Sequence, residues 1–247
     1  MIMAWYSMLS FLLNVGTQRK EGEMITAVIP VRAGSRRVPN KNIKPFGDSN
    51  LLVRKIRQLK TVSEIDEIVI SSDSDEMLEI AKNEGCLIQK RPIEYCDEKT
   101  KTFNEVVKYI ASKIFADIMI WAPCVCPFTI ADNFKSAIKS YRQNVENGPF
   151  DSVVSAKLFK EFLFDEKGPC NFSIERFVKS QDLPDWKVIV NGFFVARPSD
   201  MEKWGFVYGK NPYLVSLSKI EAIDIDDQFD FDLAEFFLKT KRYEGYK

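Results

Sequence analysis

The stretch from Ile25 to Phe46 constrains the fold most strongly, because it joins a short buried strand to a glycine-containing basic loop. The apolar run Ile25–Ile29 predicts the strand, and the proline that follows ends it. The loop around Gly34 and Ser35 contains no acidic residue, and it carries five basic ones: Arg32, Arg36, Arg37, Lys41 and Lys44. Glycine lets backbone N–H groups approach an anion, and arginine and lysine add charge and donors. The stretch therefore predicts a phosphate-binding loop after a first β-strand, with a basic surface loop after an edge strand as the alternative.

Beyond this loop, apolar runs of strand length alternate with segments of helical periodicity. The predicted strands span 25–29, 67–71, 86–89, 118–122, 152–156, 188–195, 213–216 and 222–225. The predicted helices span 51–62, 76–84, 104–115, 129–144 and 230–240, the third capped by Thr102 or Asn104. This alternation predicts an α/β fold with a mostly parallel sheet and helices on both faces.

Two segments fall outside that pattern. Residues 2–15 are apolar except for three polar residues at helical spacing, and they are shorter than the ~20 residues that a membrane span needs. We expect residues 1–23 to form an N-terminal extension outside the fold and the functional domain to span 24–247, with membrane attachment through the extension as a minor alternative. The aromatic and charged segment Phe159–Pro184 lacks a clean period and is predicted to leave the sheet.

Composition excludes several kinds of site. Lysine plus arginine equals aspartate plus glutamate at 35 each, so no overall basic field indicates a nucleic-acid partner. The chain has no histidine, which excludes Ser-His-Asp and Cys-His catalysis and histidine-ligated zinc. Its five cysteines form no C-x-x-C motif, and this indicates reduced thiols in a cytoplasmic protein.

A strongly acidic segment lies near the C-terminus. Residues 221–235 contain seven acidic residues and no basic one. On a strand, Ile223 and Ile225 would face the core while Asp224 and Asp226 share the opposite face. Two such carboxylates can bind Mg²⁺ together with phosphate oxygens. The alternative is a solvated acidic strand end. The neighbouring acids, with Asp230 as a helix cap, are predicted to be structural: Asp227, Asp230 and Asp232.

The basic loop and the carboxylate pair together predict nucleotidyl transfer. The loop would hold a triphosphate and the carboxylates a metal ion beside it, so the chemistry depends on positioning and charge neutralisation. Two other phosphate-binding signatures are missing from the loop. It is neither a G-x-x-x-x-G-K-[ST] loop nor a G-x-G-x-x-G loop, which argues against a P-loop NTPase and a dinucleotide-binding protein.

The run Ile29–Asn42 resembles the N-terminal signature of the acylneuraminate cytidylyltransferases, the CMP-sialic acid synthetases and their relatives. Short motifs continue the resemblance in the same order: Ile70–Asp73, Arg91–Pro92, Ser152–Ser155, Gln181–Pro184, Asn191–Gly192, Ile223–Asp226 and Asp230–Phe231. The resemblance implies a Rossmann-like nucleotidyltransferase fold and a homodimer, with residues 157–186 as an arm that reaches the partner. It also implies the coupling of CTP to the anomeric hydroxyl of a nine-carbon 2-keto acid sugar, giving CMP-sugar and pyrophosphate.

By the same resemblance, Arg32, Ser35 and Lys41 would contact the triphosphate, while Asn42 and Arg91 would lie at the nucleotide. The implied catalytic set is Arg32, Lys41 and Asp226. Arg91 precedes a proline, so the alternative for it is a surface turn.

The resemblance assigns Asp224 and Asp226 to Mg²⁺ or another divalent cation. It places Asn191, Phe193 and Phe194 at the sugar. Consecutive strand residues point to opposite faces, so at most one of the two phenylalanines is expected to touch a sugar and the other to lie in the core.

Several positions depart from the family pattern. The family's Gln-Pro-Thr-Ser-Pro-Leu-Arg loop reads Ala122–Phe128 here, without glutamine or arginine, and Ser180 replaces an arginine. A tyrosine expected after Asn191–Gly192 is Phe194 or Val195. Because these positions belong to the sugar side, two alternatives stay open: another acceptor, such as an eight-carbon keto acid or a sugar phosphate, and a non-enzymatic nucleotide-binding protein.

Overall fold

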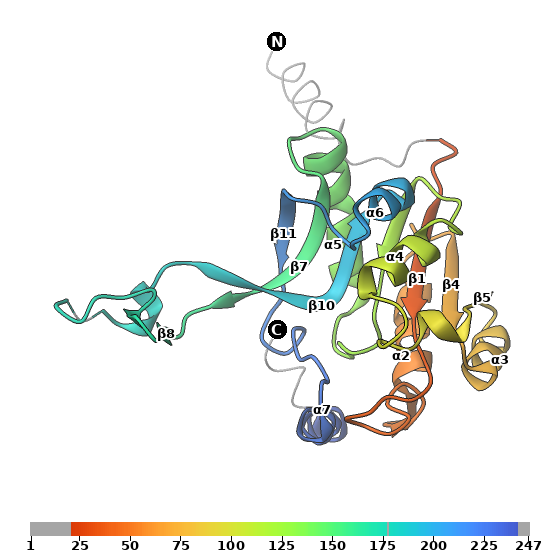
Figure 1. Cartoon of the computed structure of the whole chain (residues 1–247), viewed down its shortest axis with the longest axis horizontal. Helices are drawn as coiled ribbons and strands as arrows, with labels where there is room; N and C mark the ends of the chain where they lie inside the picture. The colour runs from red at the N-terminus through yellow and green to blue at the C-terminus, as the bar shows by residue number, and fades with distance from the viewer. Residues whose placement is uncertain (1–20, 177, 242–247) are drawn as a thin grey trace, which may run out of the picture.

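A seven-stranded sheet forms the centre of the computed structural model, which describes residues 21–176 and 178–241 (Figure 1). The strands, in spatial order, are β11 (Pro212–Ser216), β7 (Ser152–Phe159), β10 (Trp186–Ala196), β6 (Ile118–Trp121), β1 (Ile25–Pro30), β4 (Glu67–Ser72) and β5 (Leu87–Lys90). β10 runs antiparallel to both of its neighbours, and the other adjacent strands are parallel. The predicted mostly parallel α/β sheet is therefore confirmed.

The central strand β1 pairs with β4 on one side and β6 on the other, so that Val28 faces both Val69 and Trp121. Strands covered on both faces are apolar along their whole length rather than alternating. This is why Ile25–Ile29 contains only one polar residue, Thr26, and every residue of the run is buried.

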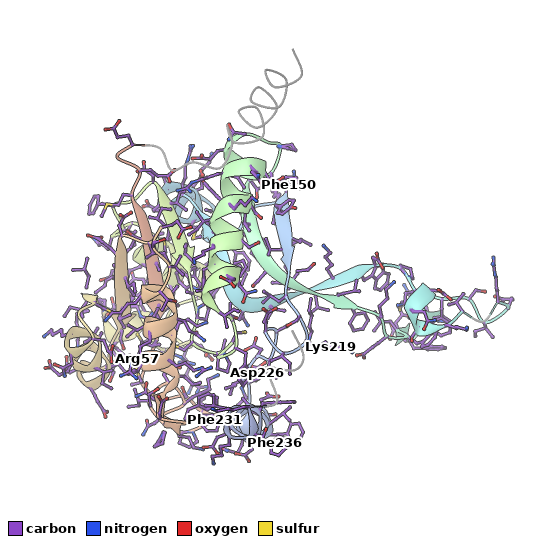
Figure 2. The ribbon with its side chains drawn as sticks, turned by 180° about the vertical axis from the view of Figure 1, so that it is seen from behind. Arg57, Phe150, Lys219, Asp226, Phe231 and Phe236 are labelled. Atoms are coloured by element: carbon purple, nitrogen blue, oxygen red, sulfur yellow. The ribbon has the colours of Figure 1, made fainter. Side chains whose placement is uncertain are left out.

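Helices cover both faces of the sheet, as the sequence predicts (Figure 1). One face carries α2 (Leu51–Lys60), α3 (Asp75–Asn83) and α5 (Ala131–Ser140), and the other carries α4 (Phe103–Ala111) and α6 (Pro198–Trp204). α7 (Gln228–Thr240) lies at the carboxyl end of β1 (Figure 1). Phe231 of this helix, labelled in Figure 2, packs edge-on against Phe46 with ring centroids 5.5 Å apart. The carboxyl ends of the parallel strands are thus bordered by α7 and by the loops that follow β1 and β6.

The predicted excursion is a long two-stranded ribbon made by the end of β7 and the start of β10 (Figure 1). Trp186 pairs with Phe159, and the register shifts between Ile189 and Phe194. The tip carries two short strands, β8 (Phe164–Asp165) and β9 (Gly168–Pro169). Apolar side chains stay exposed along the ribbon and tip: Leu158, Phe162, Phe164, Ile174, Trp186, Val188 and Ile189.

Several local predictions are wrong. Residues 222–225 do not form a strand, because their backbone pairs with a loop and a lysine instead of with a neighbouring strand. The predicted 129–144 helix is α-helical only to Ser140 and continues as η2 (Tyr141–Glu146), a π-helical segment. The sequence reading also missed some short elements: α6, β2 (Pro45–Phe46), β3 (Ser49–Asn50), η1 (Ile93–Tyr95) and η3 (Ser180–Asp182).

Most of the predicted extension, residues 1–20, lies outside the described residues. Glu23, which the sequence reading placed in the extension, is buried in the fold and forms an ion pair with Arg142 of η2. Across residues 21–176 and 178–241, no helix has the length and apolar character to cross a membrane.

Candidate active site

A cavity of about 770 Å³ opens at the carboxyl ends of β1 and β6. In open α/β sheets this edge is where ligands bind. Eight of the ten predicted site residues line the cavity: Arg32, Ser35, Lys41, Asn42, Arg91, Asn191, Phe194 and Asp226. The fold therefore brings together residues that are up to two hundred positions apart in the chain.

The basic loop after β1 forms one wall. Its arginines point toward acidic residues across the cavity: Arg37 Nη2 lies 2.7 Å from Asp226 Oδ1, and Arg32 forms an ion pair with Glu98. The loop backbone is tied to β4, because the amide of Ala33 donates to Asp73 Oδ1 at 2.9 Å. Asp73 thus acts as a loop anchor, a structural role like the turn-forming role that is common for aspartate after a strand.

Lys41 joins the basic loop to the acidic segment. Its Nζ donates to the carbonyl oxygen of Ile225 at 2.6 Å, between Asp224 and Asp226 in the chain. Burial lowers the pKa of Lys41, and the two nearby carboxylates oppose that shift. The ammonium group therefore lies at the point where both predicted binding stretches meet.

The acidic segment is extended but irregular. Ile225 is fully buried and its amide donates to the carbonyl oxygen of Val125 at 2.9 Å, which holds the flanking carboxylates in place. Asp226 is exposed and lines the cavity. Asp224 is deeper, does not line the cavity, and accepts a 2.8 Å hydrogen bond from Asn191 through Oδ2.

The second oxygen of Asp224 suits a cation. Oδ1 is buried and has no hydrogen-bond partner among the described residues, and burial raises the pKa of this carboxyl. Oxygen donors of this kind fit Mg²⁺, which takes few protein ligands and completes its shell with phosphate and water. Within the described ranges, no cluster of three or more acidic or thiol side chains could hold a metal by itself.

The acids after this pair are structural, as predicted, but the helix cap is a different residue. Asp227 caps α7 by accepting from the amide of Asp230 at 3.1 Å. The Asp230 carboxylate accepts in return from the amides of Asp226 and Asp227. This capping box fixes the backbone of Asp226 at the start of α7. Figure 2 shows Asp226 beside this helix.

Arg91 is buried rather than in a surface turn. Its Nε donates to Cys96 Sγ at 2.9 Å and its Nη2 donates to the carbonyl oxygen of Val31 at 2.7 Å. Asn42 is also buried, and its carbonyl oxygen accepts from the amide of Leu52 at the start of α2. Both predicted nucleotide contacts are therefore held by the first strand-loop-helix unit.

The structure separates the two predicted phenylalanines. Phe194 lines the cavity and stacks on Tyr208, with ring centroids 5.9 Å apart. Phe193 is fully buried in the core against Phe134, 5.7 Å between ring centroids, and does not reach the cavity. The prediction of Phe193 as a sugar contact is therefore corrected, because alternation along β10 turns it to the opposite face of the sheet.

Aromatic side chains form another part of the cavity wall, and of these only Phe194 was predicted. This aromatic wall consists of Tyr95, Phe103, Trp121, Phe194, Phe206 and Tyr208. Phe103 packs edge-on against both Trp121 and Phe206. Phe206 and Tyr208 follow the unpredicted helix α6, and no local pattern in the sequence indicated that they contact Phe103 of α4 and Phe194 of β10.

These features together match known proteins. The sequence matches the cytidylyltransferase family model over residues 26–168. The post-translational flagellin modification protein B of Campylobacter coli is 24% identical over 231 residues, covering 90% of this chain and 97% of that protein. The N-acylneuraminate cytidylyltransferase of Escherichia coli O18:K1:H7 is 25% identical over 215 residues, or 85% of this chain and 51% of the relative, so this chain spans about half of its length.

A solved structure supports the same fold. CMP:2-keto-3-deoxy-manno-octonic acid synthetase complexed with CTP superposes with a TM-score of 0.66 at 11% identity, covering 89% of this chain and 100% of that one. Similarity at this identity supports only the fold. The family match, by contrast, spans more than half of the chain and contains the basic loop, and the chain therefore belongs to the cytidylyltransferase family.

Proposed function

We propose that this protein couples CTP to the anomeric hydroxyl of an acidic nine-carbon 2-keto sugar, giving CMP-sugar and pyrophosphate. The observation that carries the proposal is the hydrogen bond from Lys41 to the Ile225 carbonyl, which sets the basic loop against the acidic segment: Asp226 lines the cavity and Asp224 lies deeper. Cationic donors beside paired carboxylates are what transfer from a triphosphate requires.

The residues of the cavity have separate tasks in this reaction. Arg32, Ser35 and Lys41 hold the triphosphate and offset charge on the departing pyrophosphate, while Asn42 and Arg91 position the nucleoside. The oxygen of the acceptor hydroxyl then bonds to the α-phosphorus as the bond to the departing pyrophosphate breaks, and the hydroxyl proton passes to solvent.

Asp224 and Asp226 would hold a divalent cation, which supplies charge neutralisation for the phosphates when bound. The buried, unpartnered Oδ1 of Asp224 supports this assignment, because burying a carboxylate without a partner is costly. Arg37, now paired with Asp226, would turn to the phosphates once a cation takes that carboxylate.

The acceptor would bind in the part of the cavity lined by Asn191, Phe194 and the other residues of the aromatic wall. Aromatic rings pack against apolar sugar substituents, while the amide of Asn191 can orient a hydroxyl. A nine-carbon keto acid is proposed because the N-acylneuraminate cytidylyltransferase is related over 85% of this chain.

The ribbon at 157–186 would be the dimer arm. It carries exposed apolar side chains such as Phe164 and Ile174, which are 65% and 70% exposed. Exposed apolar surface of this kind marks an interaction site, and a second copy of the chain is the proposed partner.

All five cysteines are free thiols, which supports a reducing compartment and hence the cytoplasm.

The test is pyrophosphate release from each of four nucleoside triphosphates with a panel of keto acid sugars. Turnover with CTP and a nine-carbon acid alone supports the proposal. Preferred turnover with an eight-carbon acid or a sugar phosphate would assign another acceptor. CTP binding without turnover on any acceptor would indicate a nucleotide-binding protein that is not an enzyme. Asp226→Asn should remove the activity, and full activity in that variant would contradict the metal assignment.

A further inference from the structure

A buried lysine lies behind the cavity wall. Lys55 of α2 is only 1% exposed, and it does not line the cavity. Its Nζ donates to the carbonyl oxygen of Cys126 at 3.0 Å and lies 5.2 Å from the centroid of the Phe134 ring. Burial lowers the pKa of Lys55 to about 8. Burying an ammonium group costs stability, because an apolar residue of similar size fits the same space without the desolvation cost. Stability alone therefore does not explain a lysine at this position.

The partner of Lys55 is the 123–127 loop, which departs from the family pattern. Two neighbours on the same helix hold the next carbonyl: Arg54 Nε and Gln58 Nε2 donate to Pro127 at 2.8 and 2.7 Å. Pro123 and Val125 line the cavity. Three side chains of α2 thus hold the back of a loop whose front faces the substrates.

The 123–127 loop is hydrogen-bonded in turn to the acidic segment. The Val125 carbonyl accepts from the Ile225 amide at 2.9 Å, and the Ile225 carbonyl accepts from Lys41 at 2.6 Å. A short series of hydrogen bonds therefore leads from Lys55 to the carboxylates on either side of Ile225 and to the phosphate loop. Each member is buried or partly buried, where hydrogen bonds are less weakened by water.

We propose that Lys55 is a positioning residue for nucleotidyl transfer, which holds the 123–127 loop so that the Asp224–Asp226 pair and Lys41 keep their places at the cavity. This inference rests on the proposed function, and it assigns to Lys55 no contact with either substrate. A shift of about 1 Å in such a group can lower the rate on the order of 100-fold.

The test compares the unchanged protein with Lys55→Met and with the exposed, same-helix control Lys60→Met. We expect Lys55→Met to lower kcat on the order of 10-fold to 100-fold and to raise the Mg²⁺ concentration for half-maximal rate, with the thermal midpoint unchanged or higher. Lys60→Met should leave kcat and the Mg²⁺ dependence unchanged. Wild-type kcat and Mg²⁺ dependence in Lys55→Met would overturn the proposal.

Amide hydrogen exchange gives a readout that needs no turnover. Peptides containing residues 123–127 and 223–227 should exchange faster in Lys55→Met, while peptides from β4 should not change. Lys55→Gln, which keeps an amide donor without the charge, is measured in parallel. Failure of both variants to fold would overturn the proposal, because Lys55 would then be required by the fold instead of the site. A wild-type protein without activity would contradict only the proposed function. The hydrogen-exchange comparison would still test whether Lys55 holds the 123–127 loop and the acidic segment.

Discussion

Lys41 donates a 2.6 Å hydrogen bond to the carbonyl oxygen of Ile225, a residue 184 positions later in the chain. The bond places an ammonium group between the carboxylates of Asp224 and Asp226 along the backbone. It therefore connects the proposed phosphate-binding loop to the proposed metal-binding pair before any substrate is bound.

The first prediction concerns that connection. Lys41→Met should lower kcat/KM for CTP by about 10²-fold to 10³-fold, because it removes a donor from the developing charge and frees the acidic segment. Steady-state pyrophosphate release measures the effect. Lys44→Met is the matched control. Lys44 lies in the same loop, but it donates a hydrogen bond to Gln228 outside the cavity, so kcat/KM of this variant should change little. Equal losses in the two variants would contradict the assigned role of Lys41.

The second prediction concerns the buried carboxyl of Asp224, whose pKa is raised by burial. A raised folded-state pKa means that ionised Asp224 destabilises the fold at pH values above that pKa. Asp224→Asn should therefore raise the thermal midpoint in metal-free buffer at pH 7. The gain should shrink as the pH falls through the folded-state pKa, and it should vanish below the unfolded-state pKa.

The same variant should lose Mn²⁺ binding in the presence of CTP, measured by calorimetry. Asp224→Asn is thus expected to raise the thermal midpoint and to lower the affinity for Mn²⁺. A lower midpoint at pH 7 together with intact Mn²⁺ binding would show that Asp224 serves the fold and not the metal.

The third prediction separates the core from the aromatic wall. Phe193→Ala should lower the free energy of unfolding by ~3–5 kcal/mol, as is usual for a fully buried phenylalanine, and should leave the acceptor KM of the folded protein unchanged. Phe206→Ala should raise the acceptor KM about tenfold or more with little change in the CTP KM, because its half-buried ring faces the cavity. Urea unfolding and kinetics with both substrates measure the two effects. A higher acceptor KM in Phe193→Ala would contradict the placement of Phe193 in the core, away from the acceptor.

The fourth prediction concerns the arm. The double variant Phe164→Ser and Ile174→Ser should shift a dimer to a monomer in analytical ultracentrifugation, because it removes two exposed apolar side chains from the proposed contact. Phe115→Ser is the control, since Phe115 is 87% exposed but belongs to the connection between α4 and β6, outside the arm. A wild-type protein that is monomeric at micromolar concentration would contradict the proposed dimer.

The amino-acid sequence was sufficient to predict the elements whose signals are local. The apolar run Ile25–Ile29 predicted β1, and Thr102 was one of two predicted caps for α4, where it forms a capping box with Glu105. It also predicted a chemistry for the two charged stretches, because a loop without acids and a segment without bases can be recognised from composition alone. Strand periodicity and helix caps act within a few residues, so no tertiary contact is needed to see them.

Tertiary structure alone decided how those elements meet. Residues 222–225 have a strand-like pattern, yet the backbone of Ile225 hydrogen-bonds to Val125 of a loop and to the Lys41 side chain instead of to a neighbouring strand. Which phenylalanine of β10 faces the cavity depended on the register with β6 and β7. The burial of Lys55 and the aromatic wall around Phe206 depended on packing between segments that lie far apart in the chain. Long-range packing has no local signal, and for that reason the sequence predicted the phosphate and metal groups but not the walls that position them.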